Sequence, residues 1–375
     1  MTDRERYRET LLFGRPDRIP FSPGGPREST RAAWKEQGLA NPDRYMDALY
    51  DILGFRPDPP KKPGVGLGVS FQMIPTFEEK VLEHRDGHYI VQDWMGAITE
   101  IADRYDYTYI RSAKDFVTRK WHKFPVETRA DWAEMKKRFD PHSPGRFPAD
   151  FEERCRRNRD RDTAVGIHFN GPFWQLREWC GFEGLCLKMI EEPEFVAEMA
   201  EFWTDFVSAT MKPILERVGL DSVGISEDMA YKEHSMISPA MTRRSLQPAY
   251  ERWAEEIHRS GCAIIDMDSD GRVDELVPIW IESGINVCDP IEVAAGNDLV
   301  AFRRRFGRKM AYTGGVDKRA IAKGGDVIEA ELRRVAPVVA DGGYIPGCDH
   351  GVPPDISWPN FVHYSRLLAR MTGWL

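Results

Sequence analysis

The chain has 375 residues with 42% hydrophobic content, enough for a large buried core, and a formal net charge of -8, which argues against a nucleic-acid surface. No apolar stretch reaches the roughly 20 residues that cross a membrane, and the charged first seven residues lack the apolar core of an export signal. The six cysteines form no Cys-x-x-Cys pair, a pattern typical of reduced thiols, so we expect a cytoplasmic protein that binds neither nucleic acid nor membranes.

The amino-terminal part predicts helices separated by Gly and Pro. Residues 1–15 predict a polar helix that ends at Gly14, and residues 17–21 lead into a first strand. The loop that follows, rich in Gly and Pro, carries Arg27. This arginine either contacts an anion at the mouth of a barrel or is an ordinary surface residue. Residues 29–38 predict the next helix.

Residues 69–112 predict a small antiparallel β insertion near the first third of the chain. Short segments that alternate or run apolar are separated by Gly87 and Gly96, which is typical of hairpins. The insertion either covers or lengthens a cleft, or supplies an edge strand to a dimer interface. Its predicted strands are residues 81–84, 89–93, 97–101 and 107–111.

From residue 149 onward, apolar strands alternate with helical segments. Strands are predicted at residues 164–169 and 222–226 and at the segments that begin near residues 263, 286, 310 and 343. The helices between them are predicted at residues 175–190, 194–217, 239–259, 272–283, 297–306 and 325–340. Six strand–helix units, with one or two more before them, predict an α/β fold, a (β/α)8 TIM barrel that forms a single domain over residues 1–375.

In a barrel of this kind, the active site lies at the carboxyl ends of the strands. Acidic residues follow several of the predicted strands at these ends. In residues 263–271 (AIIDMDSDG) an apolar run is followed at once by three aspartates. Residues 286–292, 310–317 and 344–350 repeat this design, with acids, His, Cys or Gly after the apolar run. We interpret these four ends as one wall of an active site.

Several side chains at these ends suit catalysis or substrate binding. Glu227 and Asp228 follow a strand directly and are predicted to lie nearest the substrate, with a solvated surface pair as the alternative. Asp270 is interpreted first as a helix cap, and Asp349 as the orienting partner of His350. The residues predicted to bind substrate are Arg27, His168, Trp174, Tyr231, His234 and Tyr312. For His168 and Trp174, packing in the core is the alternative.

Short motifs stand in a fixed order in the second half of the chain. They are EDMAYK (227–232), ISP (237–239), DSDG (268–271), DPIE (289–292), GGYIP (342–346), DH (349–350) and VPP (352–354). Each is weak alone. In this order and spacing the chain resembles the uroporphyrinogen decarboxylase superfamily over most of its length, most clearly from about residue 120. The resemblance implies a (β/α)8 barrel, a site at its carboxyl face and a homodimer.

Two chemistries occur in this superfamily. True uroporphyrinogen decarboxylases carry an Arg-Gln-Ala-Gly-Arg pattern that binds the carboxylates of a tetrapyrrole, and residues 23–29 (PGGPRES) lack it. Acidic strand ends suit a neutral or cationic ligand, or a metal, better than a multiply charged anion. The chain is therefore more similar to the corrinoid-dependent methyltransferase branch. A decarboxylase-type carboxy-lyase is the first alternative, and a non-catalytic binding barrel is the second.

The resemblance also implies candidate metal ligands. Methyltransferases that serve coenzyme M hold zinc through a His-x-Cys pair and a later Cys. Here Asp268 and Asp270 fill the first position, and Cys348 lies near the later one, which implies an oxygen-rich site. Zinc, or a general acid, would stabilise the leaving group of a methyl ether or methylamine. The predicted ligands are Asp268, Glu292, Cys348 and His350, with an inert thiol as the alternative for Cys348.

We therefore predict a methyltransferase that moves a methyl group from a small methoxylated or methylated donor to a corrinoid-binding protein. No cobalamin-binding domain is recognised in the chain, so the corrinoid would arrive on this partner. The predicted catalytic residues are Glu227, Asp228, Asp268 and His350.

Overall fold

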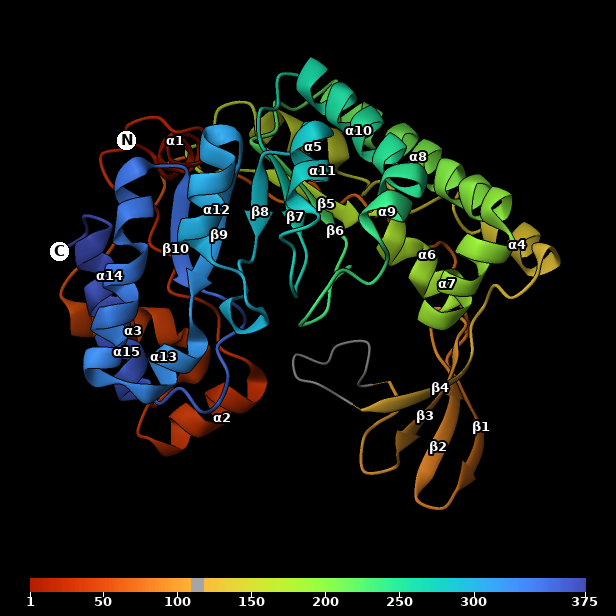
Figure 1. Ribbon diagram of the computed structural model, residues 1–375, viewed down its shortest axis with the longest axis horizontal. Coiled ribbons are helices and arrows are strands. Elements are labelled where there is room, and N and C mark those ends of the chain that lie inside the picture. Colours follow the sequence, from red (N-terminus) through yellow and green to blue (C-terminus); the bar gives the residue numbers. More distant parts are fainter. Residues whose placement is uncertain (109–117) are drawn as a thin grey trace.

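The computed structural model describes residues 1–108 and 118–375. At its centre is a parallel sheet of six strands whose order in space follows the chain, as Figure 1 shows. The strands are β5 (Gly166–Asn170), β6 (Ser222–Ser226), β7 (Ile265–Asp268), β8 (Val287–Asp289), β9 (Ala311–Val316) and β10 (Tyr344–Cys348). The predicted alternation of strands and helices, and with it the α/β class, is confirmed.

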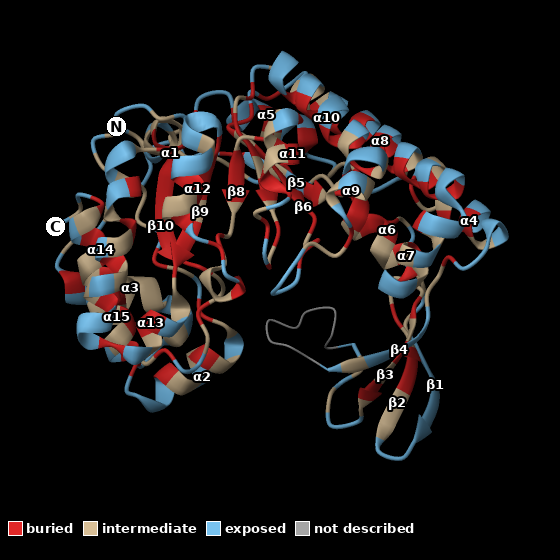
Figure 2. Cartoon of the chain, viewed as in Figure 1, coloured by how far each residue is buried: buried red, intermediate tan, exposed pale blue. Residues whose placement is uncertain are grey.

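Helices follow the strands and cover the outer face of the sheet, so that their inner sides are buried and their outer sides exposed (Figure 2). After β5 and β6 come α6 (Pro172–Cys180), α7 (Phe182–Glu191), α8 (Pro193–Leu215), α9 (Pro239–Ser245) and α10 (Gln247–Arg259). After the later strands come α11 (Val277–Glu282), η3 (Val293–Ala295), α12 (Leu299–Phe306), η4 (Gly307–Lys309), α13 (Lys318–Lys323), α14 (Gly325–Asp341) and α15 (Trp358–Met371). Within the described ranges, no helix combines the length and the apolar character that a membrane crossing requires.

Two helices that the sequence predicts as continuous are broken. The predicted helix 175–190 divides at Gly181, which has φ 72° and where a Cβ would lie 2.3 Å from the Phe124 ring. The predicted helix 239–259 divides at Leu246, two residues before Pro248, which has no N–H to donate to the preceding turn. Apolar periodicity continues across both breaks and therefore does not reveal them.

Two extended segments flank the six-stranded sheet where a full barrel would have two more strands. The chain before α2 (Glu28–Glu36) runs beside β10, and Pro26 and Val352 form a parallel bridge there. On the other side, the ring of Phe71 packs 5.2 Å from that of Phe169 in β5. No ladder between described residues joins β5 to β10, so a closed ring of eight paired strands is not observed. Proline at three positions of residues 20–26 removes donors that a ladder needs.

The first helix covers the amino-terminal ends of the strands. In α1 (Asp3–Leu11) the side chain of Leu11 packs with one apolar residue from each of four neighbouring segments of the sheet: Ile264, Val287, Ala311 and Ile345. The remaining amino-terminal elements are η1 (Pro42–Arg44), α3 (Tyr45–Leu53), α4 (Arg129–Lys136) and α5 (Phe151–Arg157). With α1 in this place, the opposite, carboxyl ends of the strands form the open face.

The predicted antiparallel insertion is a four-stranded sheet that projects from the body of the molecule (Figure 1). Its strands are β1 (Lys80–Arg85), β2 (His88–Gln92), β3 (Ile98–Ala102) and β4 (Arg119–Lys123). The prediction of the fourth strand at residues 107–111 was wrong in its described part, because residues 107 and 108 form a turn, whereas residues 109–111 lie outside the described residues. β4 instead pairs with β3.

Candidate active site

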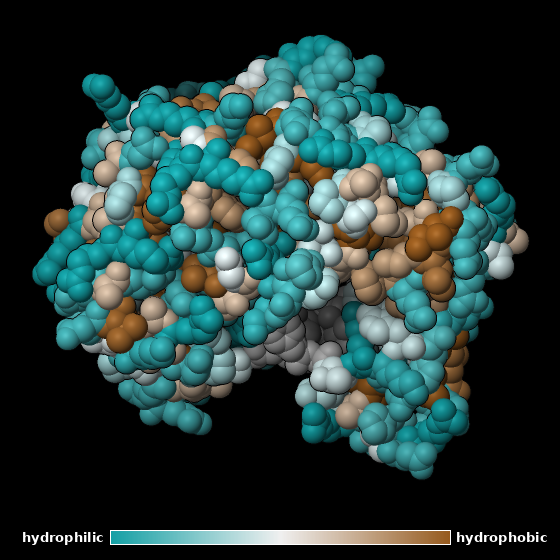
Figure 3. Space-filling model, in the orientation of Figure 1, coloured by the Kyte–Doolittle hydropathy of each residue, from teal (hydrophilic) through white to brown (hydrophobic). Residues whose placement is uncertain are grey.

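The carboxyl ends of the parallel strands point toward a hollow between α2 and the four-stranded sheet, as the ribbon and the space-filling view show (Figures 1 and 3). Side chains alternate along a strand, so Asp266 and Asp268 of β7 lie on one face while the intervening Met267 is buried in the core. This register brings the predicted acids to the interior of the strand array. We call Asp266, Asp268 and Asp289 the interior acids.

Asp268 ends a polar chain that crosses three strands. The Ser226 hydroxyl of β6 donates to Oδ2 of Asp268 at 2.9 Å, and Nε2 of His168 on β5 contacts the same hydroxyl. The ring of His168 fits because Gly224 on β6 has no side chain, and a Cβ there would lie 2.3 Å from Nδ1. Burial raises the pKa of Asp268 to about 6, and it lowers the pKa of His168. The chain can therefore hold and pass a proton near neutral pH.

The two other interior acids lie beside and below Asp268. Asp289 is the ladder partner of Asp268 on β8, and its carboxylate accepts a hydrogen bond from the hydroxyl of Thr313. Asp266 lies deeper, and its Oδ1 is shielded from solvent without a hydrogen-bond partner among the described residues. Burial, together with the neighbouring carboxylates, raises the pKa of Asp266 well above its usual range, and burial raises that of Asp289.

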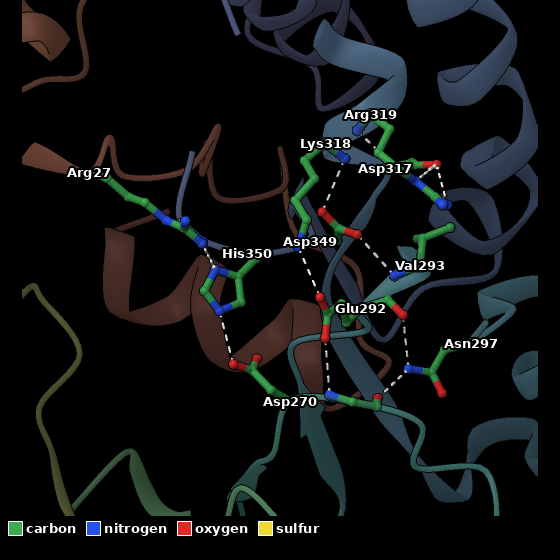
Figure 4. Close-up of polar contacts among 12 residues, drawn as sticks. Arg27, Asp270, Glu292, Val293, Asn297, Asp317, Lys318, Arg319, Asp349 and His350 are labelled. Carbon is green, nitrogen blue, oxygen red and sulfur yellow. Dashed lines mark hydrogen bonds and ion pairs between the residues drawn. The ribbon is translucent and has the colours of Figure 1, made fainter. Parts of the chain in front are cut away.

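A second polar chain lies at the mouth of the site (Figure 4). Nε2 of His350 lies 2.9 Å from Oδ2 of Asp270, and its Nδ1 lies 3.0 Å from Nη2 of Arg27 and 2.7 Å from the backbone N of Gly351. Because two N–H donors approach Nδ1, the ring proton resides on Nε2 and is donated to Asp270. The hydrogen bond to Asp270 raises the pKa of His350, against burial and the charge of Arg27. The predicted Arg27 and His350 are thus brought together.

Asp270, which sequence reasoning interpreted as a helix cap, is the partner of His350. The predicted orienting residue, Asp349, accepts instead from the backbone N of Val293 at 2.9 Å and of Lys318 at 3.0 Å. It is fully buried and braces two loops. These two interpretations were wrong because a sequence does not show which carboxylate a loop places next to the imidazole.

Glu292 lies beside the mouth, where its carboxylate contacts Lys318 and the backbone of Gly271 (Figure 4). Its Oε1 lies 2.9 Å from Nζ of Lys318, and its Oε2 accepts from the backbone N of Gly271 at 3.0 Å. The ion pair is mostly shielded from solvent, since the two side chains keep less than a fifth of their exposure. Glu292 therefore ties the loop after β7 to α13.

The neighbours Glu227 and Asp228 have different surroundings. Glu227 is fully buried; it accepts hydrogen bonds from the Tyr250 hydroxyl and from the backbone N of Trp174, and burial raises its pKa to about 7. Asp228 has φ 42° and partial exposure at the mouth, and its Oδ2 lies 3.5 Å from Nη2 of Arg177. Burial raises the pKa of Asp228 as well. Of the two, only Asp228 has surface that a substrate could touch.

The other predicted substrate-binding residues are spread over three environments. The indole N–H of Trp174 donates to Glu178 at 2.8 Å beside the β5 end. Tyr231 and His234 share an exposed loop, with ring centroids 6.3 Å apart. Tyr312 lies elsewhere than predicted, because it points to the outer face of β9, where it is fully buried next to Phe302. Successive side chains of β9 point to opposite faces, so the next residue, Thr313, faces the interior.

The four predicted zinc ligands do not fit a metal ion together. Asp268 is bound to Ser226, Glu292 to Lys318 and His350 to Asp270. Cys348 is buried in the apolar core, and burial raises its pKa to about 12, which disfavours the thiolate that zinc requires. In the described part of the chain, no group of three or more His, Cys, Asp or Glu side chains is placed to hold a metal.

Sequence reasoning placed Asp266 and Asp289 in the predicted wall of the active site but assigned them no role, and it missed Ser226. Strand alternation carried a signal for Asp266, because it shares a face with Asp268 two residues later. Asp289 lies at the end of another apolar run, in the segment 286–292. Serine at a strand end has no distinguishing pattern of its own, so Ser226 becomes visible only through its contacts with His168 and Asp268.

Residues 120–367 match the family model described as Uroporphyrinogen decarboxylase (URO-D). A search of curated protein sequences finds no match. Among solved structures, the fold is similar to that of a methyltransferase from Methanosarcina mazei, with 14% identity, a TM-score of 0.58 and coverage of 100% of this chain and 98% of that one. A B12-independent methionine synthase from Shewanella sp. W3-18-1 matches with 12% identity, a TM-score of 0.44 and coverage of 95% and 97%.

Proposed function

We propose that this chain, which belongs to the uroporphyrinogen decarboxylase family through the match of its residues 120–367, transfers a methyl group to a corrinoid. The donor is a small methoxylated or methylated compound, and the corrinoid arrives on a partner protein. The fold similarity to a methyltransferase is compatible with this activity. The chemistry of the site supports the activity more directly.

One observation carries the proposal: Asp268 is a proton-holding acid that faces the interior at the carboxyl end of its strand. With a pKa of about 6, roughly one-tenth of Asp268 is protonated at pH 7, far more than of an ordinary aspartate, and its proton is available at little cost. The contact with Ser226, and through it with His168, gives a route for restoring that proton. A poor leaving group such as an alkoxide or phenoxide needs such a proton.

With Asp268 as the acid, each bond and electron pair of the methyl transfer is accounted for. When the donor is a methyl ether, the carbon–oxygen bond breaks and its electron pair stays on oxygen, which takes the proton of Asp268. The methyl carbon bonds to the co-reactant, cobalt(I) of the corrinoid, which supplies the new electron pair and is formally oxidised to cobalt(III). General acid catalysis of this kind contributes typically about 10²- to 10⁴-fold in rate.

The charges of the site favour this activity over decarboxylation of a tetrapyrrole. Of the described residues, Arg27, Lys318 and Arg177 are cations at the mouth, and each contacts a group of the protein itself. The surrounding strand ends carry mostly carboxylates, which repel a multiply charged anion. The carboxy-lyase alternative would need cations that are available to the substrate.

The test uses the purified protein with a reduced corrinoid protein and a panel of methoxylated and methylated donors. Cobalt absorption follows methyl transfer, and we expect Asp268→Asn to lower the rate by 10²-fold or more. Asp205→Asn is the matched control, because Asp205 is an exposed aspartate on α8. Methyl transfer by Asp268→Asn at the wild-type rate would contradict the role of this acid. Release of carbon dioxide from uroporphyrinogen, without methyl transfer, would support the carboxy-lyase alternative.

The corrinoid partner and the homodimer stay predictions. Sedimentation of the protein alone and with the corrinoid protein measures both, with an expected dimer in the first case and a larger complex in the second.

A further inference from the structure

The chain between β6 and α9 forms a short hairpin at the mouth of the site, and Figure 1 shows it projecting from the end of β6 toward the hollow. Ala230 and Ser235 pair as an antiparallel bridge, and the backbone N of Tyr231 donates to the carbonyl oxygen of His234 at 3.0 Å. We call residues 229–236 the mouth hairpin. Its hydrogen bonds make it a defined element rather than an irregular loop.

The base of the mouth hairpin is fixed to the loop that follows β7. Met229 is fully buried, and its backbone N donates to the hydroxyl oxygen of Ser269 at 3.1 Å. The backbone N of Arg272 donates to the carbonyl oxygen of Tyr231 at 2.9 Å. These bonds hold the hairpin in place beside the strand end that carries Asp268.

The tip of the mouth hairpin, residues 231–234, is exposed, whereas Met229 and Ala230 at its base are buried. Tyr231 is 50% exposed, and its ring lies against that of His234, with centroids 6.3 Å apart. Tyrosine is one of the residue types that most often anchor a protein–protein interface. A tip on a fixed base also loses little conformational entropy when a partner contacts it. The tip therefore has the properties of a preorganised recognition element.

The loops on the opposite side of the mouth use their polar side chains for contacts with one another (Figure 4). Asp270 after β7 binds His350 after β10, and Glu292 after β8 binds Lys318 after β9. These pairs tie four strand ends into a frame. The tip of the mouth hairpin, beside this frame, instead has its side chains exposed to solvent.

Methyl transfer to cobalt restricts where the partner can bind. The oxygen of the donor takes the proton of Asp268, so the methyl carbon beside that oxygen lies at the same strand end, and cobalt must come within bonding distance of it. Because a protein carries the corrinoid, the surface of that protein then meets the rim of the mouth. The mouth hairpin is part of this rim, since it starts directly after Asp228, and the backbone N of Glu227 donates to the carbonyl oxygen of Asp268 at 2.9 Å.

From these observations we propose that the tip of the mouth hairpin is a docking contact for the corrinoid-binding partner, with Tyr231 as its anchor. This inference rests on the proposed methyl transfer and names a surface that the partner recognises. The partner would hold the ring of Tyr231 in an apolar recess, with charges opposite to those of Lys232 and Glu233 around it. Tyr231 then serves the partner rather than the donor, which is the role that the sequence predicted.

Binding of the corrinoid protein that accepts methyl in the assay above tests the inference, measured by calorimetry without a donor. We expect Tyr231→Ala to raise the dissociation constant at least 10-fold, because the aromatic anchor is lost. The side chain is exposed, so the variant keeps the fold. Val327→Ala is the control, because Val327 is 42% exposed on the outer helix α14, and we expect it to bind as the wild type does.

Kinetics of a second variant separate docking from donor binding. In the double variant Lys232→Ala, Glu233→Ala we expect the KM for the corrinoid protein to rise at least 3-fold. Methyl transfer to free cobalamin(I), which has no protein surface to dock, should proceed as in the wild type.

Two results would overturn the inference while leaving the proposed function intact. The first is wild-type affinity in Tyr231→Ala together with an unchanged KM in the double variant. The second is a loss of transfer to free cobalamin(I) in the double variant, because the tip would then serve the donor. Failure of the wild-type protein to methylate either acceptor would refute the proposed function, and the inference with it.

Discussion

Glu227 shows how one side chain can connect three elements out of reach of solvent. The first residues of α6 have unsatisfied N–H groups, and their cap position is Gly171, which has no side chain to offer. The carboxylate of Glu227 accepts from Trp174 N at 2.9 Å and occupies the space that a Cβ on Gly171 would need. The Tyr250 hydroxyl of α10 donates to the same carboxylate.

This position predicts an effect on the pH dependence of stability. Burial raises the pKa of Glu227 from its usual 4.5 to about 7, so the folded state binds this proton more tightly than the unfolded state does. Its contribution to the free energy of unfolding is therefore greatest below pH 4.5 and falls as the pH rises to about 7. At about 1.4 kcal/mol per pKa unit, the loss is about 3 kcal/mol.

Glu227→Gln should remove this loss, so that the variant gains roughly 3 kcal/mol relative to the wild type between pH 4 and pH 8. Urea unfolding at the two pH values measures the difference. A wild-type pH dependence in the variant would show that Glu227 is ionised at no cost in the folded protein.

Sequence reasoning about single residues predicted which side chains gather at the carboxyl ends of the strands but not their contacts. Asp228, Asp268, Arg27 and His350 all reach one end of the strand array, because strand ends and their loops follow from the alternation of apolar and polar segments. The pairing of His350 with Asp270 depends on side-chain directions in loops. Tyr312 shows that a shift of one position along a strand moves a side chain to the opposite face of the sheet, because its neighbour Thr313 faces the interior.

At the scale of elements, the break between α6 and α7 sets the direction of both helices. Gly181 has φ 72° and ψ 163°, a conformation that is essentially restricted to glycine, and it lies against the ring of Phe124. The two helices pack against each other and against α8. The start of α6 lies over Glu227, and α7 buries Leu185 and Met189 while its opposite side is exposed.

Gly181→Ala should destabilise the protein by at least about 2 kcal/mol, because it adds both backbone strain and a collision with Phe124. Gly184→Ala, three residues further in α7, is the matched control. A Cβ at Gly184 meets no atom within 4 Å, so this change should be neutral or stabilise by up to about 1 kcal/mol. Thermal unfolding of both variants measures the contrast, and equal effects would refute the strain argument.

Elements with a local signal were predictable, and elements defined by distant contacts were not. Strand β6 has the bounds that its apolar run predicts, Ser222–Ser226. The fourth strand of the insertion was placed too early, because the choice between two segments depends on pairing with β3. The two flanking segments of the six-stranded sheet are extended as a barrel requires, but their prolines and glycines weaken the strand pattern.

At the scale of the whole molecule, a buried ion-pair network joins α1 to the amino-terminal side of the sheet. Asp221, just before β6, is fully buried and accepts from Nε of Arg4 at 2.8 Å and from the backbone N of Val165 at 2.9 Å. The side chain of Arg161, itself 1% exposed, binds Oδ2, the oxygen that also accepts from Val165 N, whereas Arg4 binds Oδ1. Residues far apart in the sequence therefore depend on one carboxylate.

Asp221→Ala should destabilise the protein by about 3–5 kcal/mol, because the change leaves the buried Arg161 without its counter-ion. Glu282→Ala removes the partner of Arg243 from an exposed pair and should cost at most about 1 kcal/mol. Chemical unfolding at neutral pH compares the two variants. A loss of less than 1 kcal/mol in Asp221→Ala would mean that water enters the network and replaces the carboxylate.

The position of α1 also decides how the protein can be attached to a surface. Trp374, next to the last residue, donates its indole N–H to the carbonyl oxygen of Ile19 at 2.8 Å, and the guanidinium of Arg18 stacks over its ring at 4.3 Å. The two chain ends therefore lie on the α1 side, away from the mouth. A chip or bead coupled through either end would hold every molecule with its open face toward the solution, where donor and partner arrive.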